Sequence, residues 1–310
     1  WSENAHEFRL TPWGNDPVSD SSGEAFYIRD EERGHFWSPT PLPSRGATPY
    51  VTRHGFGYSV FEHTERGIRS EVWVYVAIDA SVKFTVIKVR NQSGRSRRLS
   101  ATGYAEWVLG DLRPKSTMHV VTEVDPNSGV LFARNSYNTE FANRVAFFDV
   151  DDAPRTLSGD RTEFLGRNGT LRSPAAMTRS RLSGKVGAAL DPCAAIHVPF
   201  DLADGQEREI IFRLGTGRDT DDAINLVRRF RGSAAARIAL DAVWQYWNHT
   251  LGAVNVETPD QSVNILANGW LLYQTLACRL WARSGYYQSA GAFGFRDQLQ
   301  DVMALIHTEP

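Results

Sequence analysis

The sequence RSGYYQSAGAFGFRDQLQD, residues 283–301, combines three glycines with a dense set of polar side chains. Glycines disfavour both a helix interior and a plain strand, and they let the backbone approach a ligand closely. We therefore expect a loop here, followed by a helix. On that helix Asp297, Gln300 and Asp301 share one face, because residues three and four positions apart are neighbours. Fixed donors and acceptors behind a glycine-rich loop are what a sugar-binding pocket requires.

The bulk properties narrow the class of protein. The chain has 310 residues and a net charge of −2, so nothing indicates nucleic acid or an acidic membrane surface as a partner. Two lone cysteines, Cys193 and Cys278, fit a reducing compartment better than a disulfide scaffold. No apolar run approaches the roughly 18 residues of a membrane span, and no signal peptide is present. Because the first residue is Trp1 and not Met, we expect a piece of a longer protein.

Short strands are expected over most of residues 1–217. Phe26–Arg29 and His35–Ser38 flank a loop with a late glycine, which predicts a hairpin. Glu71–Ala77 is β-branched and aromatic, and predicts a strand buried on both faces. Further strands are expected at 82–86, 99–109, 130–133, 145–150 and 209–214. Residues 154–184 are rich in Arg, Ser, Gly and Thr and show no clear period, so we expect a solvated loop region, with a phosphate- or glucan-binding surface as the alternative. Many short strands without helical periodicity indicate a large antiparallel sandwich.

The pattern becomes helical near residue 219. Residues 219–232 begin with capping acids and end at a glycine, which predicts one helix, and a second amphipathic helix starts near Ser233. Thr258-Pro-Asp-Gln261 matches a capping box with Thr258 at the cap of a third helix. From Val263 to Trp281 this helix is apolar on nearly all sides, which predicts burial on all sides.

Several long motifs resemble a single family. They are GYYQS at 285–289, GFRDQLQD at 294–301, SENAHEFRLTPWGNDPVSD at 2–20, FWSPTPLP at 36–43 and RHGFGYS at 53–59. Together they resemble the inverting β-glucan and cellobiose phosphorylases of the glycoside hydrolase family 94 type. The similarity is greatest to the branch found in β-1,2-oligoglucan phosphorylases and in the C-terminal region of cyclic β-1,2-glucan synthases. The motifs are spread over the whole chain.

The resemblance implies a multidomain β + α fold. Its parts are a large antiparallel β-sandwich of the supersandwich type, a helical linker, and the first helices of an (α/α)6 toroid. We expect the sandwich domain at 1–217, the linker helices at 218–254, and the start of a truncated catalytic domain at 255–310.

The resemblance also implies a reaction. The family cleaves a β-glucosidic bond, here in β-1,2-glucan, with inorganic phosphate and inversion, giving α-glucose 1-phosphate. Because phosphate is the nucleophile, the protein has to supply only a general acid. In the family that acid is an Asp of a later motif, so no catalytic residue is expected in this chain, and the segment alone is expected to be inactive. Two alternatives stay open: a non-catalytic glucan-binding or assembly module of a cyclic β-1,2-glucan synthase, and an inverting hydrolase on the same fold.

Site residues are assigned by the same resemblance. Asp297 is expected to bind hydroxyls of the glucose whose bond is cleaved, with Arg296 holding its carboxylate; the alternative is a helix cap with an ion-pair partner. Other expected substrate contacts are Gln298, Gln300, Asp301, Tyr287 and Gln288, and for the first three of these bracing of the loop is an equal alternative. Arg283 and Arg279 are candidate phosphate ligands, or favourable cations at a helix C-terminus. Cellobiose-type relatives carry an Arg where this chain has Gly291 and Ala292, which fits a different linkage.

The Pro-rich block at residues 38–43, with Trp13 and Trp37, is expected at the mouth of a catalytic cleft, where the indole rings stack on glucose. The implied partners are a β-glucan oligosaccharide, phosphate, the rest of the same polypeptide and a second copy in a homodimer. The eight histidines show no metal-ligand spacing, so we expect no metal and no cofactor other than phosphate as co-substrate. The expected location is the cytoplasm, or the cytoplasmic side of the inner membrane for a synthase.

Overall fold

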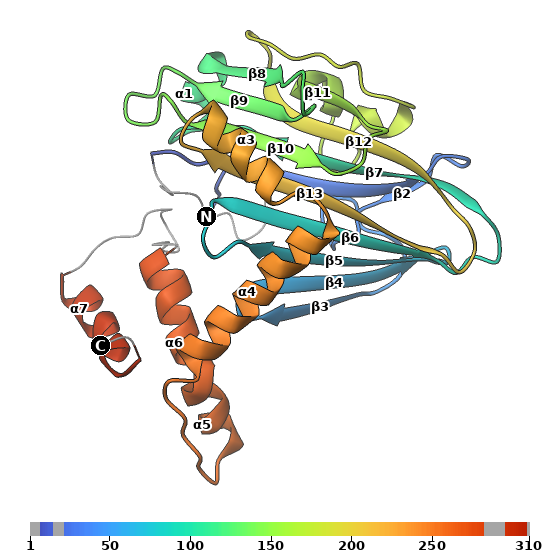
Figure 1. The fold of residues 1–310 in the computed structure, drawn as a ribbon. Helices are drawn as coiled ribbons and strands as arrows, with labels where there is room; N and C mark the ends of the chain where they lie inside the picture. Colours follow the sequence, from blue (N-terminus) through green and yellow to red (C-terminus); the bar gives the residue numbers. More distant parts are fainter. Residues whose placement is uncertain (1–6, 15–21, 282–294, 309–310) are drawn as a thin grey trace.

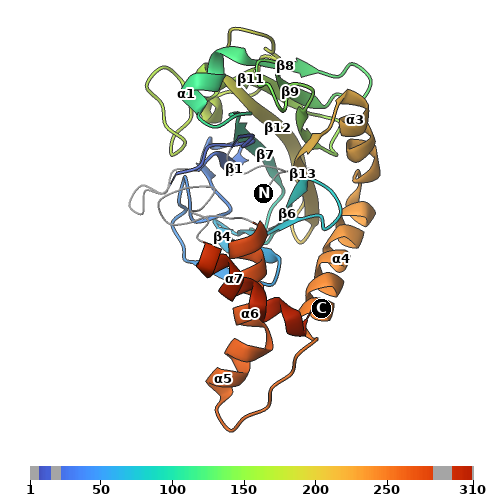
Figure 2. The same cartoon turned by 90° about the vertical axis from the view of Figure 1, so that its left-hand side faces the viewer.

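The chain is a two-sheet sandwich followed by helices (Figure 1). The computed structural model describes residues 7–14, 22–281 and 295–308. The last strand ends at Gly217, and the described elements after it are helical. The two sheets lie face to face, and helices run along the outer face of the larger one (Figures 1 and 2). The expected fold class, an antiparallel sandwich followed by helices, is therefore confirmed.

The smaller sheet has five antiparallel strands. Their spatial order is β11 (Thr156–Asp160), β12 (Pro192–Leu202), β7 (Arg97–Glu106), β1 (Glu24–Asp30) and β2 (Phe36–Trp37). Strands β1 and β2 pair Ile28 with Trp37, which confirms the hairpin expected there. Strand β7 is the central strand: β12 pairs with its whole length, and β1 pairs with it from Leu99 to Ala105.

The larger sheet has eight antiparallel strands. Their order is β3 (Tyr50–Gly55), β4 (Tyr58–Glu65), β5 (Ile68–Val76), β6 (Val82–Asn91), β13 (Glu207–Gly217), β10 (Val145–Val150), β9 (Leu131–Asn135) and β8 (Val120–Val124). The first four follow each other as a meander, and β13 then returns from far along the chain to pair with β6. A short helical turn, α1 (Arg113–Ser116) and η1 (Thr117–His119), connects β7 to β8.

The main core lies between the sheets. Inward residues of both sheets, among them Ile28, Val72, Ile87 and Phe212, are fully or almost fully buried. A Cβ at Gly103 of β7 would lie 2.8 Å from the ring of Phe212 and 2.9 Å from that of Phe148. Only glycine fits there, because a side chain would clash with both rings in the space between the sheets.

Helices cover the outer faces of both sheets. On the smaller sheet, α2 (Arg161–Leu165) and η2 (Ala175–Thr178) cover the outer face, with Phe164 stacked on Tyr104 at 4.5 Å. On the larger sheet, α3 (Thr220–Arg229) and α4 (Ser233–Leu251) do the same. The Tyr75 hydroxyl of β5 donates a 2.7 Å hydrogen bond to the carbonyl of Ala236 in α4. Asp219 caps α3 through the N–H of Asp222, as the sequence predicts.

A buried ion cluster joins the larger sheet to the turn between α3 and α4. Arg213 of β13 is fully buried and donates 2.7 Å hydrogen bonds to Asp149 and to the carbonyl of Phe230. Asp151 lies 2.5 Å from the same guanidinium and accepts a hydrogen bond from the N–H of Gly232. The cluster therefore fixes where the chain leaves the sandwich.

Two predictions about the sandwich need correction. Residues 154–184 were expected to be a solvated loop, yet they contain β11, α2 and η2, and Phe164 is buried. Strand β5 is not buried on both faces: Arg69 is exposed, and Glu71 and Trp73 are half-buried on its outer face. The outer face is only partly covered, because α4 crosses the sheet near one end of β5.

The helical prediction for residues 258–281 also needs correction. The helix begins two residues later than expected, at Gln261, because Asp260 and not Thr258 accepts the N–H of Ser262. It continues as α5 (Gln261–Ile265), η3 (Leu266–Trp270), α6 (Leu271–Gln274) and η4 (Thr275–Trp281). It is not buried on all sides. Its exposed apolar side chains are Val263, Ile265, Leu266, Trp270, Leu271 and Trp281.

Candidate functional site

The stretch expected to form a sugar pocket follows in sequence the helix that ends at Trp281, which is bent at Asn268 and Gly269. Tyr287, Gln288 and Arg283 lie outside the described residues. The remaining expected contacts, Arg296, Asp297, Gln298, Gln300 and Asp301, are on α7 (Phe295–Met303), which is followed by η5 (Ala304–His307). The side chains of Asp297 and Gln298 are also outside the description, whereas Arg296 and Gln300 are exposed. The sugar-binding roles of these residues stay predictions.

Two of the predicted site residues meet in the structure. Nε of Arg279 in η4 lies 2.5 Å from a carboxylate oxygen of Asp301 in α7, and each side chain is 38% exposed. This ion pair links the elements on either side of residues 282–294. Because its charge is partly compensated by Asp301, Arg279 can bind a phosphate only by sharing or breaking this contact. The pair fits bracing of the loop for Asp301 at least as well as sugar binding.

The motif RHGFGYS forms the turn that holds the bent helix against the sandwich. Phe56 and Gly57 are the turn residues between β3 and β4. The N–H of Gly57 donates to the Tyr273 hydroxyl at 3.1 Å, and the rings of Phe56 and Tyr273 are 5.0 Å apart. A Cβ on Gly269 of the helix would lie 3.0 Å from Phe56, so the backbone approaches that ring closely. The turn therefore positions the helix that carries Arg279.

Trp247 of α4 completes this contact. Its ring lies 4.6 Å from that of Tyr273 and 5.2 Å from that of Trp281, the last described residue before the glycine-rich stretch. A Cβ on Gly57 would lie 2.4 Å from Nε1 of Trp247. Packed aromatic rings of this kind restrict the orientation of the helix and hence the point from which residues 282–294 start.

The Pro-rich block is tied down by a buried carboxylate. Glu65 of β4 accepts the N–H of Ala47 at 2.8 Å and contacts His35 at 3.0 Å and His63 at 3.4 Å. The hydroxyl of Tyr50 accepts the N–H of Gly46 at 2.8 Å and donates to the carbonyl of Ser38, also at 2.8 Å. Ser38 at the start of the block and Gly46 and Ala47 just after it are thus fixed to the larger sheet, while Leu42 near the end of the block is half exposed.

The two cleft tryptophans have different environments. Trp37 is fully buried and stacks on His35 at 5.6 Å. It therefore offers no ring face to a sugar, and its expected stacking role is wrong. The burial follows from its position in β2, where the Trp37 side chain points into the main core. Trp13 is 38% exposed, with the guanidinium of Arg9 lying 5.5 Å from its ring centre. Its role in a cleft stays a prediction.

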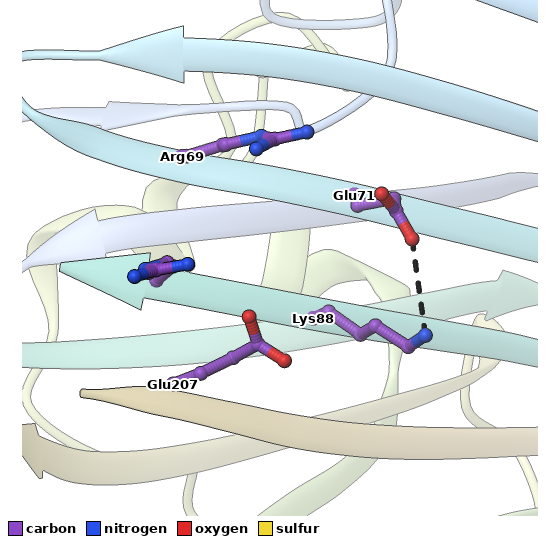
Figure 3. Close-up of a pocket in the computed structure, with 5 residues that line it drawn as sticks. Arg69, Glu71, Lys88 and Glu207 are labelled. Atoms are coloured by element: carbon purple, nitrogen blue, oxygen red, sulfur yellow. Dashed lines mark ion pairs between the residues drawn. The ribbon is translucent and has the colours of Figure 1, made fainter. Parts of the chain in front are cut away.

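Two neighbouring hollows lie on the outer face of the larger sheet. One, of about 140 Å³, is lined by Arg69, Glu71, Lys88, Arg90 and Glu207 (Figure 3). The other, of about 190 Å³, lies between this face and α4, and shares Lys88 with the first. Its other lining residues are Trp73, Tyr75, Val86, Glu209, Ser233, Ala236, Arg237, Leu240, Asp241 and Trp244. We call the two hollows together the outer trough.

Sequence reasoning did not find the outer trough. Its residues come from β5, β6, β13 and α4, which are up to about 170 positions apart, and no local motif connects them. The one available signal is the alternation of charged and aromatic residues in Arg69, Glu71 and Trp73, which places all three on one face of a strand.

Metal and membrane signals are absent from the described part of the chain. No group of three or more His, Cys, Asp or Glu side chains is arranged to hold a metal ion within these residues. Nor does any helix among them combine the length and apolar character needed to cross a membrane.

The described residues form an antiparallel two-sheet sandwich followed by helices, and two models of one carbohydrate-active family match these two parts. Residues 1–233 match the glycosyl hydrolase 94 supersandwich domain. Residues 246–310 match the catalytic domain of the glycosyl hydrolase 94 superfamily. The chain therefore belongs to glycosyl hydrolase family 94, as its motifs indicate.

Curated relatives include a synthase and several phosphorylases. The chain is 39% identical to the cyclic β-(1,2)-glucan synthase NdvB of Rhizobium meliloti over 99% of its own length and 11% of that protein. It is 27% identical to an N,N'-diacetylchitobiose phosphorylase of Vibrio furnissii, covering 97% of this chain and 39% of that one. It is 28% identical to a solabiose phosphorylase of Paenibacillus borealis, covering 90% and 36%. The chain thus spans well under half of these relatives.

Among solved structures, a putative kojibiose phosphorylase from human microbiome aligns with 81% of this chain and 30% of its own, at a TM-score of 0.45 and 8% identity. A family GH92 α-mannosidase from Bacteroides thetaiotaomicron aligns with 85% and 32%, at a TM-score of 0.45 and 12% identity.

Proposed function

We propose that this chain is part of an inverting phosphorylase that cleaves β-1,2-glucan with inorganic phosphate and releases α-glucose 1-phosphate. Membership of glycosyl hydrolase family 94 supports the phosphorylase reaction, because the relatives from Vibrio furnissii and Paenibacillus borealis are named phosphorylases. The observation that favours the β-1,2 linkage is the 39% identity to a cyclic β-(1,2)-glucan synthase over nearly the whole chain. The partners are then the glucan, phosphate and the rest of the polypeptide, in a homodimer, in the cytoplasm or at the cytoplasmic side of the inner membrane.

In this proposal the chain divides into a sandwich at 1–217, linker helices at 218–254 and the start of the catalytic domain at 255–310. The general acid lies in a later part of the polypeptide. The contribution of this chain is to bind and orient the glucose whose bond is cleaved, through Asp297 and Arg296. A carboxylate that accepts two sugar hydroxyls makes charge-assisted hydrogen bonds, which strengthen as the ring flattens toward an oxocarbenium-like transition state.

Phosphate dependence tests the reaction. The intact polypeptide is incubated with β-1,2-glucan, with and without inorganic phosphate, and glucose 1-phosphate and free glucose are measured. Glucose 1-phosphate formed only with phosphate supports phosphorolysis, whereas free glucose formed without phosphate supports the hydrolase alternative. β-1,3- and β-1,4-glucans serve as controls for the linkage.

Replacing Asp297 tests the sugar contact. Asp297→Ala is expected to cost about 3 kcal/mol of transition-state binding, a loss of roughly a hundredfold in kcat/KM that appears mainly in kcat. Asp297→Asn keeps the shape without the charge and is expected to restore activity only in part. Asp260→Ala is the matched control, since Asp260 is a helix cap in the structure. A cap variant melts earlier but turns over normally per folded molecule; if Asp297→Ala does the same, the assignment is wrong.

The second candidate function is a non-catalytic glucan-binding or assembly module of a cyclic β-1,2-glucan synthase. It is favoured by the same 39% identity, because that relative is named a synthase. Glucan binding by the intact polypeptide without any phosphate-dependent turnover is the result that supports this candidate over the first.

A further inference from the structure

The outer trough is built from aligned rows of side chains across three strands. Strand register places Arg69, Arg90 and Glu207 side by side in one row. The next row contains Glu71, Lys88 and Glu209, and the one after it Trp73, Val86 and Ile211. The three rows lie on the outer face because alternate residues of a strand point to the same side. Figure 3 shows Arg69 and Glu207 of the first row and Glu71 and Lys88 of the second. From Arg90 to Val86 the rows extend over about 14 Å, at about 3.4 Å per residue.

An aromatic cluster closes one end of the trough. The rings of Tyr58 and Trp73 stack at 5.5 Å, and Trp244 of α4 meets both edge to face, at 5.9 and 6.1 Å. Trp244 is 37% exposed, so part of its ring remains open to a ligand. The indole N–H of Trp73 donates to Glu71 at 2.6 Å, which fixes that ring. The cluster is therefore a rigid apolar platform beside charged groups.

The charges along the trough cancel. Four of the lining side chains are cationic, namely Arg69, Lys88, Arg90 and Arg237. Four are anionic, namely Glu71, Glu207, Glu209 and Asp241, so the sum is zero. Several are already paired, as Lys88 is with Glu71 at 3.8 Å. An anion or a cation would meet as many repulsive as attractive groups, whereas a neutral ligand with many hydroxyls can accept from the cations and donate to the carboxylates.

We propose that the outer trough binds a neutral glucan chain, at a site separate from the glycine-rich stretch 283–301. Sugar rings have apolar C–H faces that pack on indole and hydroxyls that hydrogen-bond to charged groups, so one ring rests on Trp244 and the following units lie over Lys88 and Arg90. The length of the rows fits a chain of several units better than a single sugar. The identity of the glucan, β-1,2-linked, rests on the proposed function; the trough itself does not.

The trough is expected to raise the affinity for long glucans only. A polymer held in the trough has a raised local concentration at the catalytic pocket, so the intact protein binds long chains more tightly than short ones. Short oligosaccharides that fill only the catalytic pocket gain nothing from the trough. We therefore expect that binding in the trough lowers the KM for polymer and leaves kcat unchanged.

The test compares variants of the intact polypeptide by calorimetric titration with long β-1,2-glucan and by turnover of long and short substrates. Trp244→Ala is expected to weaken polymer binding about tenfold and to raise the KM for polymer similarly, because one aromatic stacking contact is worth about that factor. Trp244→Leu keeps apolar bulk against Tyr58 and Trp73 and is used in case the alanine variant is unstable. Turnover of short oligosaccharides stays unchanged in both.

Tyr137→Ala is the matched control, because Tyr137 is a more exposed aromatic residue, stacked on His119 outside the trough. It is expected to bind polymer as the unmodified protein does. Hydrogen exchange adds a readout that needs no variant: long glucan is expected to slow exchange in residues 69–90 and 233–244. Polymer affinity that is the same in Trp244→Leu, Tyr137→Ala and the unmodified protein overturns the proposal.

The outcomes also separate this proposal from the proposed function. If the unmodified protein phosphorolyses β-1,2-glucan but the Trp244 variants bind polymer normally, the trough is refuted and the function stands. If β-1,2-glucan is neither bound nor cleaved, while β-1,3- or β-1,4-glucan binds in a manner that depends on Trp244, the trough stands and the linkage is wrong.

Discussion

At the scale of single residues, buried charged groups stabilise the molecule. Arg213 and Asp149 are both fully buried, so their ion pair, together with Asp151 and Arg231 beside it, offsets the loss of water. Glu65 is buried beneath the Pro-rich block and is held by a backbone N–H and two histidines. Removing one partner of such a group leaves an uncompensated charge in an apolar region, which costs more than losing a surface ion pair.

Arg213→Ala is expected to lower the free energy of unfolding by about 3 kcal/mol, because the buried Asp149 loses its 2.7 Å hydrogen bond and keeps only Arg231 at 3.0 Å and Arg155 at 3.5 Å. Urea unfolding of the intact polypeptide measures the change. The matched control is Arg218→Ala, which removes an exposed arginine paired with Asp222 and is expected to cost about 1 kcal/mol or less. Equal effects of the two substitutions would contradict the role assigned to the buried cluster.

Glu65 gives the fold a dependence on pH. Burial raises the pKa of its carboxyl, but the hydrogen bonds from Ala47 and His35 and the attraction of His35 and His63 outweigh burial, so the pKa is lowered from its usual value of 4.5. A carboxyl with a lowered folded-state pKa contributes stability above the unfolded pKa, and this contribution is lost as the pH falls through the folded value. The Pro-rich block is therefore expected to detach on acidification below about pH 4.5.

Glu65→Gln is expected to reduce stability at pH 7 and to flatten the loss of stability below about pH 4.5, since the variant has no proton to bind there. Urea unfolding as a function of pH measures both effects. The control is Glu32→Gln, an exposed carboxylate paired with Arg95, for which we expect an unchanged curve. If Glu65→Gln loses stability below about pH 4.5 as steeply as the unmodified protein does, other carboxylates cause that loss.

At the scale of elements, the turn between β3 and β4 joins the sandwich to the helix that ends at Trp281. Gly57 has a φ of +80°, and a Cβ there would lie 2.4 Å from Trp247. Gly57→Ala therefore combines backbone strain with a clash against the aromatic cluster. Gly34→Ala is a matched control, because Gly34 has a φ of +69° but nothing within 4 Å of the added Cβ.

Gly57→Ala is expected to destabilise the protein by at least 1 kcal/mol more than Gly34→Ala, whose cost is backbone strain alone, of the order of 1 kcal/mol. The excess should appear as faster proteolysis within residues 252–281, since the helix loses its support. Thermal melting and limited proteolysis of the intact polypeptide measure the two effects. If both variants behave alike, the turn does not hold the helix.

At the scale of the whole molecule, the 310-residue polypeptide has an unevenly covered surface. The sandwich buries its main core between its two sheets, whereas the helices after Asp260 expose Val263, Ile265, Leu266, Trp270, Leu271 and Trp281. Exposed apolar side chains gathered on one helix are typical of an interaction surface. In the family this helix belongs to a ring of helices, which fits an apolar pattern on all its sides.

The 310-residue polypeptide by itself is therefore expected to bind a hydrophobic dye and to self-associate. Ile265→Lys with Leu271→Lys should reduce dye fluorescence by about half or more and favour the monomer, because two charges interrupt the surface. Ile238→Lys is the control: Ile238 is 68% exposed on α4, away from this helix, and its replacement should change neither. Dye fluorescence and analytical ultracentrifugation measure the outcome.

The elements that could be predicted from the sequence are those that depend on residues close to one another along the chain. The hairpin at Phe26–Trp37 and the cap at Asp219 depend on residues within a few positions, and both are observed. The helix that begins at Gln261 starts two residues later than predicted. Thr258 and Asp260 are both good capping residues, but only Asp260 accepts the N–H of Ser262. Strand β11 and helix α2 were missed because their residues are polar and lack a clear period; Phe164 is buried through a contact with Tyr104 of another strand.

The sequence by itself determined the sandwich-then-helix order, the family and the stretch that carries Asp297, because periodicity and motifs are local properties of the chain. The tertiary structure alone decided which tryptophans are available: Trp37 is buried in the core, whereas Trp73 and Trp244, 171 positions apart, meet beside an electrically balanced trough. It also decided that Arg279 and Asp301 pair. The physical reason is that strand order and register bring distant residues together, and neither can be read from neighbours along the chain.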